Sequence, residues 1–259
     1  MELFDTHAHI GLIESSQMEQ LMAVQKAKLK GVRHMVSICN TLSDFTKTYQ
    51  NLKSQKEVYH AVGVSPTTAY DPGVDWLKKI QEYTALPGII AIGETGLDYF
   101  HKDTDKNAQI EVFQRTLDLA AKLHKPVIIH NRMAGNDLLT ILRDKLPEEG
   151  GILHCYSEDW DFACQALDLN LTISFAGNVT FSSSRALREC ARMLPIDRFV
   201  IESEAPFLAP VPYQNQRNQL SFLPATLECI ATLRHTTAEN IAPQIYQNSL
   251  RAFHLDEQA

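Results

Sequence analysis

Short runs of apolar and β-branched residues alternate with longer amphipathic stretches along the whole chain. The clearest helical pattern lies in residues 107–124, where Ile110, Phe113, Leu117 and Ala121 recur at helical spacing. The strand-like runs cover residues 3–10, 32–39, 58–64, 88–99, 126–132, 151–157, 170–177 and 198–206. This order of strand then helix, repeated eight times, predicts a mostly parallel sheet.

The number of repeats narrows the fold class. Eight strand–helix units in 259 residues fit a closed (β/α)8 TIM barrel of the α/β class better than an open doubly wound sheet, which remains the alternative. No Gly/Ser/Pro-rich linker and no internal repeat divides the chain, so we expect one domain over residues 1–259.

Composition excludes several classes of protein. With 44% hydrophobic and 21% charged residues, the chain is not disordered as a whole. No apolar run approaches the roughly 18 residues that span a bilayer, and the five cysteines contain no C-x-x-C pair, so we expect a cytoplasmic protein without a membrane partner. A net charge of −7 argues against a broad basic surface for nucleic acid, so any phosphodiester must be bound locally.

The residues that end the predicted strands are of one chemical kind, imidazoles and carboxylates. They are His7, His9, Glu94, His130, His154, Glu202 and Glu204. Because active sites of such barrels lie at the carboxyl ends of the strands, these side chains should converge on one rim. Glu202 and Glu204 are two residues apart on one strand, so they should point into the same space. So many buried polar groups are costly unless cations neutralise them, which predicts a metal site.

The spacing also indicates how ions would be held. His7 and His9 share a strand face and can reach one ion. The two carboxylate oxygens of Glu94 could connect that ion to a second one held by His130 and His154, about 3.5–4 Å away. A single ion, with the remaining residues in support, is the alternative. Imidazole with carboxylate ligation admits Zn, Mn, Mg or Ni.

Four motifs resemble those of the TatD-type metal-dependent deoxyribonucleases of the amidohydrolase superfamily. They are "FDTHAHI", "AIGETGLDY", "PVIIHNRMA" and "ILHCYS", which are similar to D-T-H-x-H, I-G-E-x-G-L-D, P-V-x-x-H-x-R-x-A and H-x-F-S. The resemblance covers essentially the whole chain and implies hydrolysis of phosphodiester bonds at DNA or RNA ends with two divalent ions. It implies Glu94 and Glu204 as catalytic residues, with Glu204 also a ligand and the base for the attacking water.

The chain departs from the family pattern at three places. "ESEAP" replaces E-T-D-A-P, so Glu204 stands where an aspartate is expected, and its extra ~1.5 Å of reach must be absorbed or the side chain must swing away. "GVSPT" replaces G-V-H-P-H, which puts Ser65 at a position expected to face the phosphate. "RNQL" replaces R-N-E-P and keeps Arg217 and Asn218. Ser65, Arg132, Arg217 and Asn218 are therefore the expected substrate-binding residues.

Other residues near the predicted rim receive supporting roles. Asp5, Asp98 and Glu202 are expected to support ligand histidines without contacting the ions. Three aromatic side chains could stack on a base, although core packing is the alternative for each: Tyr99, Phe100 and Tyr156. Strand alternation turns Cys155 away from the site, as a small buried hydrophobe.

The leading hypothesis is a 3′-end-directed nuclease on single-stranded DNA or RNA. One alternative is a metal-dependent hydrolase of another bond, such as an aminoacyl-tRNA ester or a small amide, which the loss of an imidazole at Ser65 favours. Another is a degenerate member that binds nucleic acid or a protein partner in an assembly without turnover, which the changes at Glu204 and Ser65 favour.

Overall fold

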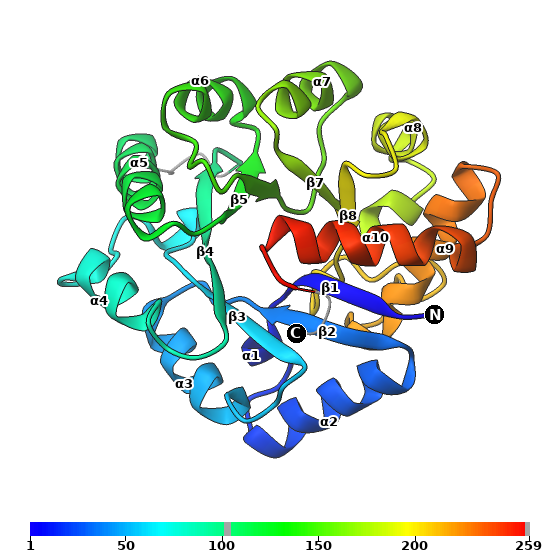
Figure 1. The fold of residues 1–259 in the computed structure, drawn as a ribbon, viewed down its shortest axis with the longest axis horizontal. Helices are drawn as coiled ribbons and strands as arrows, with labels where there is room; N and C mark the ends of the chain where they lie inside the picture. The colour runs from blue at the N-terminus through cyan, green and yellow to red at the C-terminus, as the bar shows by residue number, and fades with distance from the viewer. Residues whose placement is uncertain (101–104, 257–259) are drawn as a thin grey trace.

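Eight strands lie side by side in sequence order, and each runs parallel to the next. The computed structural model describes residues 1–100 and 105–256. The strands are β1 (Leu3–Ala8), β2 (Val32–Ser37), β3 (Val58–Val62), β4 (Ile89–Asp98), β5 (Val127–Arg132), β6 (Gly151–Leu153), β7 (Thr172–Phe175) and β8 (Phe199–Ile201). Figure 1 shows them as a ring with the helices around it.

Helices follow the strands in the order that the sequence pattern predicts. The α-helices are α1 (Ile10–Ile13), α2 (Gln17–Leu29), α3 (Leu42–Leu52), α4 (Trp76–Tyr83), α5 (Lys106–Leu123), α6 (Gly135–Lys145), α7 (Trp160–Asp168), α8 (Arg185–Met193), α9 (Leu223–Leu233) and α10 (Ala238–Ala252). Short 3₁₀ helices are η1 (Pro66–Thr68), η2 (Gly177–Thr180) and η3 (Leu220–Phe222). No helix within the described residues is long and apolar enough to cross a membrane.

The ring closes between the last strand and the first. Thr6 Oγ1 in β1 donates to the carbonyl of Ile201 in β8 (3.0 Å), and beyond β8 the amide of Glu204 donates to the carbonyl of His7 (3.0 Å). The predicted (β/α)8 barrel is therefore confirmed, and the open sheet is excluded. Closure also brings the segment after β8 against the histidines of β1.

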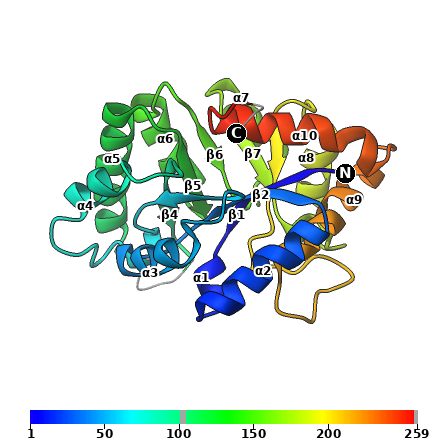
Figure 2. The same cartoon turned by 60° about the horizontal axis from the view of Figure 1, so that its bottom comes forward.

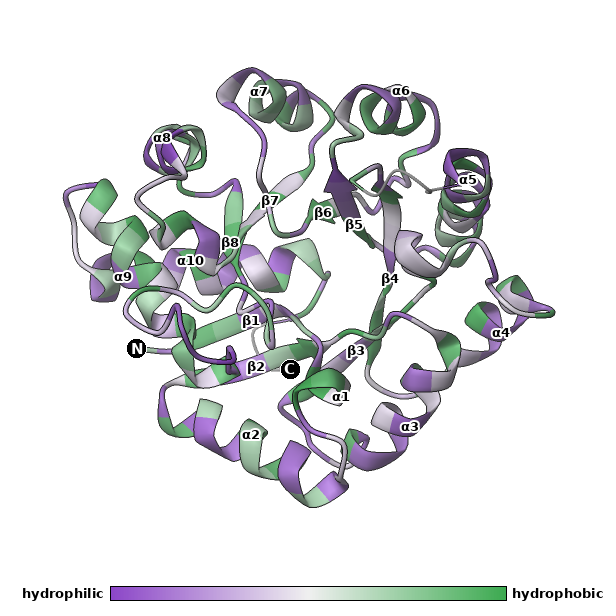
Figure 3. Cartoon of the chain, turned by 180° about the vertical axis from the view of Figure 1, so that it is seen from behind, coloured by the Kyte–Doolittle hydropathy of each residue, from purple (hydrophilic) through white to green (hydrophobic). Residues whose placement is uncertain are grey.

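One mouth of the barrel is sealed by apolar side chains. Phe4, Ile128 and Val200 belong to a buried cluster inside the ring, and Leu250 and Phe253, at the end of α10, pack against it. Figure 1 shows α10 lying across this mouth, and Figure 2 shows α10 and α1 on opposite sides of the ring. Figure 3 views the other mouth, where the end of β5 is hydrophilic. The predicted ligand residues therefore lie away from the mouth that α10 covers.

The buried face of α5 differs from the predicted one. Phe113 and Leu117 are buried as expected, but Ile110 is only half-buried and Ala121 is exposed. The face instead continues through Thr116 and Ala120. Thr116 can be buried because its hydroxyl, the only polar group of the side chain, donates to the carbonyl of Val112 (2.7 Å). The polar residue type had favoured an exposed position.

Candidate metal centre

A cavity of about 450 Å³ opens at the carboxyl ends of the strands. Its lining combines imidazoles and carboxylates with amide, hydroxyl and apolar side chains. The residues that line it are His9, Asn40, Ser65, Thr67, Glu94, Asp98, His130, Asn131, Arg132, His154, Cys155, Ser157, Asn178, Glu204, Phe207 and Leu208. Most of the predicted strand-end residues therefore share one space.

Two histidines from β1 form one side of the cluster. The Nε2 atoms of His7 and His9 lie 3.2 Å apart, and both residues are buried. Burial lowers the pKa of His7 well below its ordinary value and lowers that of His9 to about 4. Both imidazoles are therefore neutral at physiological pH, which is the form that binds a metal ion.

Glu94, in β4, lies between this pair and a second pair of histidines. Its Oε2 atom is 3.9 Å from His7 Nε2 and 3.7 Å from His9 Nε2. Its Oε1 atom is 2.9 Å from His130 Nδ1 and 3.6 Å from His154 Nε2. Burial opposes ionisation of Glu94, but hydrogen bonds from His130 and His154 hold its pKa well below the usual range. The two oxygens of one carboxylate thus face two separate groups of ring nitrogens.

Two further carboxylates hold the second pair of rings. Asp98 Oδ2 lies 3.1 Å from His130 Nε2, and Glu202 Oε1 lies 3.4 Å from His154 Nδ1. Burial would lower the pKa of each histidine, but hydrogen bonds to these carboxylates and to Glu94 raise both. Pairing a ligand histidine with a carboxylate fixes the tautomer and the ring orientation. Asp98 and Glu202 lie where that support is needed.

Glu204 reaches the cluster by a route that strand alternation does not describe. β8 ends at Ile201, and Glu204 has a left-handed backbone with φ of 55°, so the expected in-strand relation to Glu202 is wrong. The two carboxylates nevertheless meet, because Glu204 Oε2 lies 3.3 Å from His7 Nε2 and 3.8 Å from His154 Nδ1. Burial, together with the nearby charges of Glu202 and Glu94, raises the pKa of Glu204 well above its usual value.

The unpaired atoms in this cluster fit divalent metal ions. Three groups of ligand atoms each lie within 4.8 Å of one another: His7, His9 and Glu204; His7, His154 and Glu202; and Glu94, His130 and His154. Within the described residues, the buried Glu204 Oε2 has no hydrogen-bond partner. A cation would satisfy the lone pairs and offset the repulsion between Glu204 and its neighbouring carboxylates. The donor set and its burial therefore suit metal binding.

Asp5 and Ser65 have hydrogen-bond partners that differ from those expected from the sequence. Asp5 Oδ1 accepts hydrogen bonds from the amides of Ser203 (2.8 Å) and His7 (3.3 Å), so it ties the segment after β8 to β1 and supports no imidazole ring. Ser65 lines the cavity, but its hydroxyl donates to Glu94 Oε1 (3.3 Å). Ser65 thus acts on a carboxylate of the cluster.

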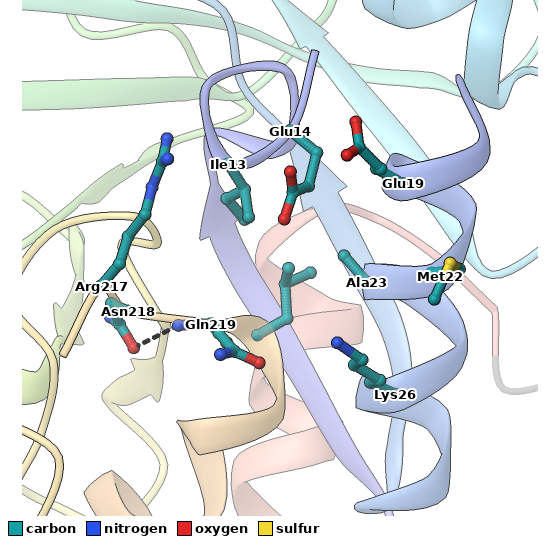
Figure 4. Close-up of a pocket in the computed structure, with 10 residues that line it drawn as sticks. Ile13, Glu14, Glu19, Met22, Ala23, Lys26, Arg217, Asn218 and Gln219 are labelled. Atoms are coloured by element: carbon teal, nitrogen blue, oxygen red, sulfur yellow. Dashed lines mark hydrogen bonds between the residues drawn. The ribbon is translucent and has the colours of Figure 1, made fainter. Parts of the chain in front are cut away.

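The four expected substrate-binding residues do not lie together. Ser65 and Arg132 line the cavity. Arg217 is exposed, donates to the carbonyl of Leu12 and lines a different groove beside α2 (Figure 4). Asn218 is fully buried, and its amide donates to the carbonyls of Ser203 (2.6 Å) and Phe207 (2.5 Å). The structure therefore does not bring Arg217 and Asn218 to the cavity that Ser65 and Arg132 line.

The three aromatic residues and Cys155 differ in whether they are packed, exposed or in the cavity. Tyr156 is buried and its hydroxyl donates to Asp159, and the Tyr99 hydroxyl donates to Asp137, so these two are packed side chains. Phe100 is half exposed beneath the guanidinium of Arg132. Cys155 lines the cavity rather than facing away, because β6 ends at Leu153 and Cys155 has φ of 47°.

Several cavity residues are not predicted by the sequence pattern, among them Asn40, Asn178 and Phe207. Each of these three follows a strand by three to six residues, since β2 ends at Ser37, β7 at Phe175 and β8 at Ile201. Their positions just after strand ends could have identified them as site residues. The prediction of a metal site, however, depends only on imidazoles and carboxylates.

Comparisons with known proteins find metal-dependent hydrolases among the relatives of this chain. The family model described as TatD related DNase matches residues 4–254. The uncharacterized metal-dependent hydrolase YcfH of Escherichia coli (strain K12) is 35% identical over 260 residues, covering 99% of this chain and 97% of the relative. The 3′-5′ ssDNA/RNA exonuclease TatD of Pantoea vagans is 30% identical over 203 residues, covering 76% and 78%.

A solved structure supports the fold. YJJV, a TatD homolog from Escherichia coli K12, superimposes with a TM-score of 0.92 over 98% of both chains at 23% identity. This likeness agrees with the barrel architecture described above.

Proposed function

The chain belongs to the TatD-related DNase family of metal-dependent hydrolases, and from that membership we propose that it removes nucleotides from the 3′ ends of single-stranded DNA or RNA. One observation carries the proposal: the two oxygens of Glu94 face two separate groups of imidazole nitrogens. That arrangement suits two divalent ions, which supply Lewis acidity to a phosphoryl group and a nucleophile from water at neutral pH when bound.

Each residue of the cluster has a definite task in this proposal. His7, His9 and Glu204 would hold one ion and His130 and His154 the other, with Glu94 between the two groups. Asp98 and Glu202 keep the rings of His130 and His154 in place. We assign Glu204 Oε2, which lies buried beside His7, as the proton acceptor for the attacking water. Arg132 offers a cation at the cavity wall for a substrate phosphate.

The test is cleavage of 5′-labelled single-stranded DNA and RNA by metal-loaded protein. We expect a ladder of products shortened from the 3′ end, abolished by chelator and at least about 100-fold weaker in His130→Ala. Activity that survives the chelator or the substitution would contradict the metal centre. Products shortened from the 5′ end would contradict the assigned polarity alone.

A second candidate is hydrolysis of an ester or amide. Ser65 favours it, because a hydroxyl engaged with Glu94 gives a phosphate no charged partner at that position. Turnover of an aminoacyl ester together with inactivity on both oligonucleotides would select this candidate. Binding without turnover has less support, since Glu204 remains within 3.3 Å of His7 despite its extra length.

A further inference from the structure

We propose that Phe207 is a stacking surface for the terminal base, in the same cavity as a phosphate-directed cation at Arg132. The site would then select an unpaired terminal nucleotide. This inference rests on the proposed function and names the feature of the substrate that the cavity recognises.

Phe207 presents an aromatic ring at the edge of the metal-ligand cluster. The side chain is 49% exposed and lines the cavity. Its ring meets His9 edge to face, with ring centroids 5.9 Å apart and an interplanar angle of 75°. A base stacked on this ring would lie next to a proposed metal ligand. Exposed phenylalanine is costly in water, so a ring held here gains by being covered.

The backbone of Phe207 is held by hydrogen bonds on both sides. The amide of Phe207 donates to the carbonyl of Glu204 (2.8 Å), and its carbonyl accepts from the buried amide of Asn218. Asn218 also holds Ser203 (2.6 Å), so the ring and the carboxylate of Glu204 are tied to one support. An ordered ring loses little conformational entropy when a base stacks on it.

Arg132 is the second part of the proposed site. It lies two residues after His130, and its guanidinium carbon is 3.6 Å from the centroid of the Phe100 ring. Among the described residues it forms no ion pair with a carboxylate, although its charge contributes to lowering the pKa of Asp98, and stacking on Phe100 orients the guanidinium. A planar guanidinium in this state suits a phosphate oxygen.

The shape and charge of the molecule favour a single nucleotide. A cavity of about 450 Å³ is within the range of small-molecule sites and has no room for a duplex end. A paired terminal base is also already stacked on its neighbour, so it would have to be unstacked first. With a net charge of −7, the protein has little broad attraction for nucleic acid, which makes stacking of about 1–3 kcal/mol per base important.

The test compares kcat/KM of metal-loaded protein on two single-stranded oligonucleotides that differ only in whether the 3′-terminal residue carries a base. The variants are Phe207→Ala, Phe207→Leu, which keeps an apolar side chain without a ring, and Tyr70→Ala as a control. Tyr70 is 76% exposed and does not line the cavity. We expect both Phe207 variants to lose roughly 5–150-fold on the normal substrate and little on the abasic one. Tyr70→Ala should match the unaltered protein.

A binding measurement separates this inference from the proposed function. Metal-free protein should quench the fluorescence of a 3′-terminal 2-aminopurine, and Phe207→Ala should not. If the unaltered protein cuts both oligonucleotides equally well, or if Phe207→Ala loses equally on both, the stacking role is wrong and the nuclease stands. Quenching by Phe207 without cleavage of either oligonucleotide would keep the stacking site and reject the nuclease. Neither cleavage nor quenching would reject both.

Discussion

Glu204 owes its place in the cluster to its backbone as much as to its carboxylate. Its backbone has φ of 55°, its amide donates to the carbonyl of His7, and its carbonyl accepts from the amide of Phe207. The chain therefore turns away from the direction of β8 at this residue. This path absorbs the length of a glutamate and still brings Oε2 to 3.3 Å from His7 Nε2. The identity of the ligand residues was predictable from strand ends, but this left-handed turn was not, since alternation describes only extended chain.

Shortening Glu204 should therefore weaken the site. In Glu204→Asp the carboxylate withdraws by about 1.5 Å, so we expect turnover to fall at least tenfold, and in Glu204→Ala by several orders of magnitude. Aspartate tolerates a left-handed backbone better than glutamate does, so the loss would not come from backbone strain. Rates should be measured at equal metal content, with Glu204→Asn as the uncharged control. Higher turnover in Glu204→Asp would contradict a compensated site.

Ser65 provides a second test at the level of one side chain. Its hydroxyl donates to Glu94 Oε1, the oxygen that faces His130 and His154. Ser65→Ala should weaken binding of one ion about 10–100-fold while the other ion binds as before, because only one carboxylate oxygen loses its support. Calorimetric titration of metal-free protein reports the two affinities separately. Equal weakening of both ions, or of neither, would contradict this role.

At the scale of elements, the buried side chain of Asn218 links parts of the segment between β8 and α9 to one another. Asn218 donates to the carbonyls of Ser203 and Phe207, and its own oxygen accepts from the amide of Gln219 (2.8 Å). The strands and their order followed from the apolar pattern, but this loop has no periodicity to interpret. Its sequence therefore suggested a substrate contact at Asn218, where the structure has a support for the backbone.

Removing that support should be costly. Asn218→Ala leaves buried backbone groups without partners, at about 1–3 kcal/mol each, so we expect a loss of at least about 2 kcal/mol in the free energy of unfolding. Metal affinity should fall too, because Glu204 lies within the same segment. Urea unfolding, with the exposed Gln216→Ala as the control, measures the first effect. An unchanged midpoint would show that the loop is held by other contacts.

At the scale of the whole molecule, the barrel separates its chemistry from its stability. The ligand-type residues gather at one mouth, while the remainder of the ring packs apolar and neutral side chains. His60 in β3 belongs to the second group, since it is buried against the ring of Tyr49 with centroids 5.0 Å apart. Burial lowers the pKa of His60 to about 4, from an ordinary value of 6.5.

This histidine should make the fold sensitive to acid. Above pH 6.5 it is neutral in both states and adds no pH dependence. As the pH falls from 6.5 to about 4, His60 becomes protonated in the unfolded chain but stays neutral in the folded protein. The free energy of unfolding therefore falls by about 3 kcal/mol over this range. The difference in unfolding free energy between the unaltered protein and His60→Phe should change over this window. A difference that stays constant over this window would contradict the role of His60.

The seal that α10 forms has a kinetic consequence. Because Leu250 and Phe253 close one mouth against Phe4, the cavity is closed toward that end of the barrel and opens at the carboxyl ends of the strands. A nucleic-acid strand cannot pass through the barrel. A released mononucleotide must therefore leave through the opening by which the 3′ end of the next substrate enters. We therefore expect mononucleotide products to compete with oligonucleotide substrate, raising KM without changing kcat. Noncompetitive inhibition would instead reveal a separate exit.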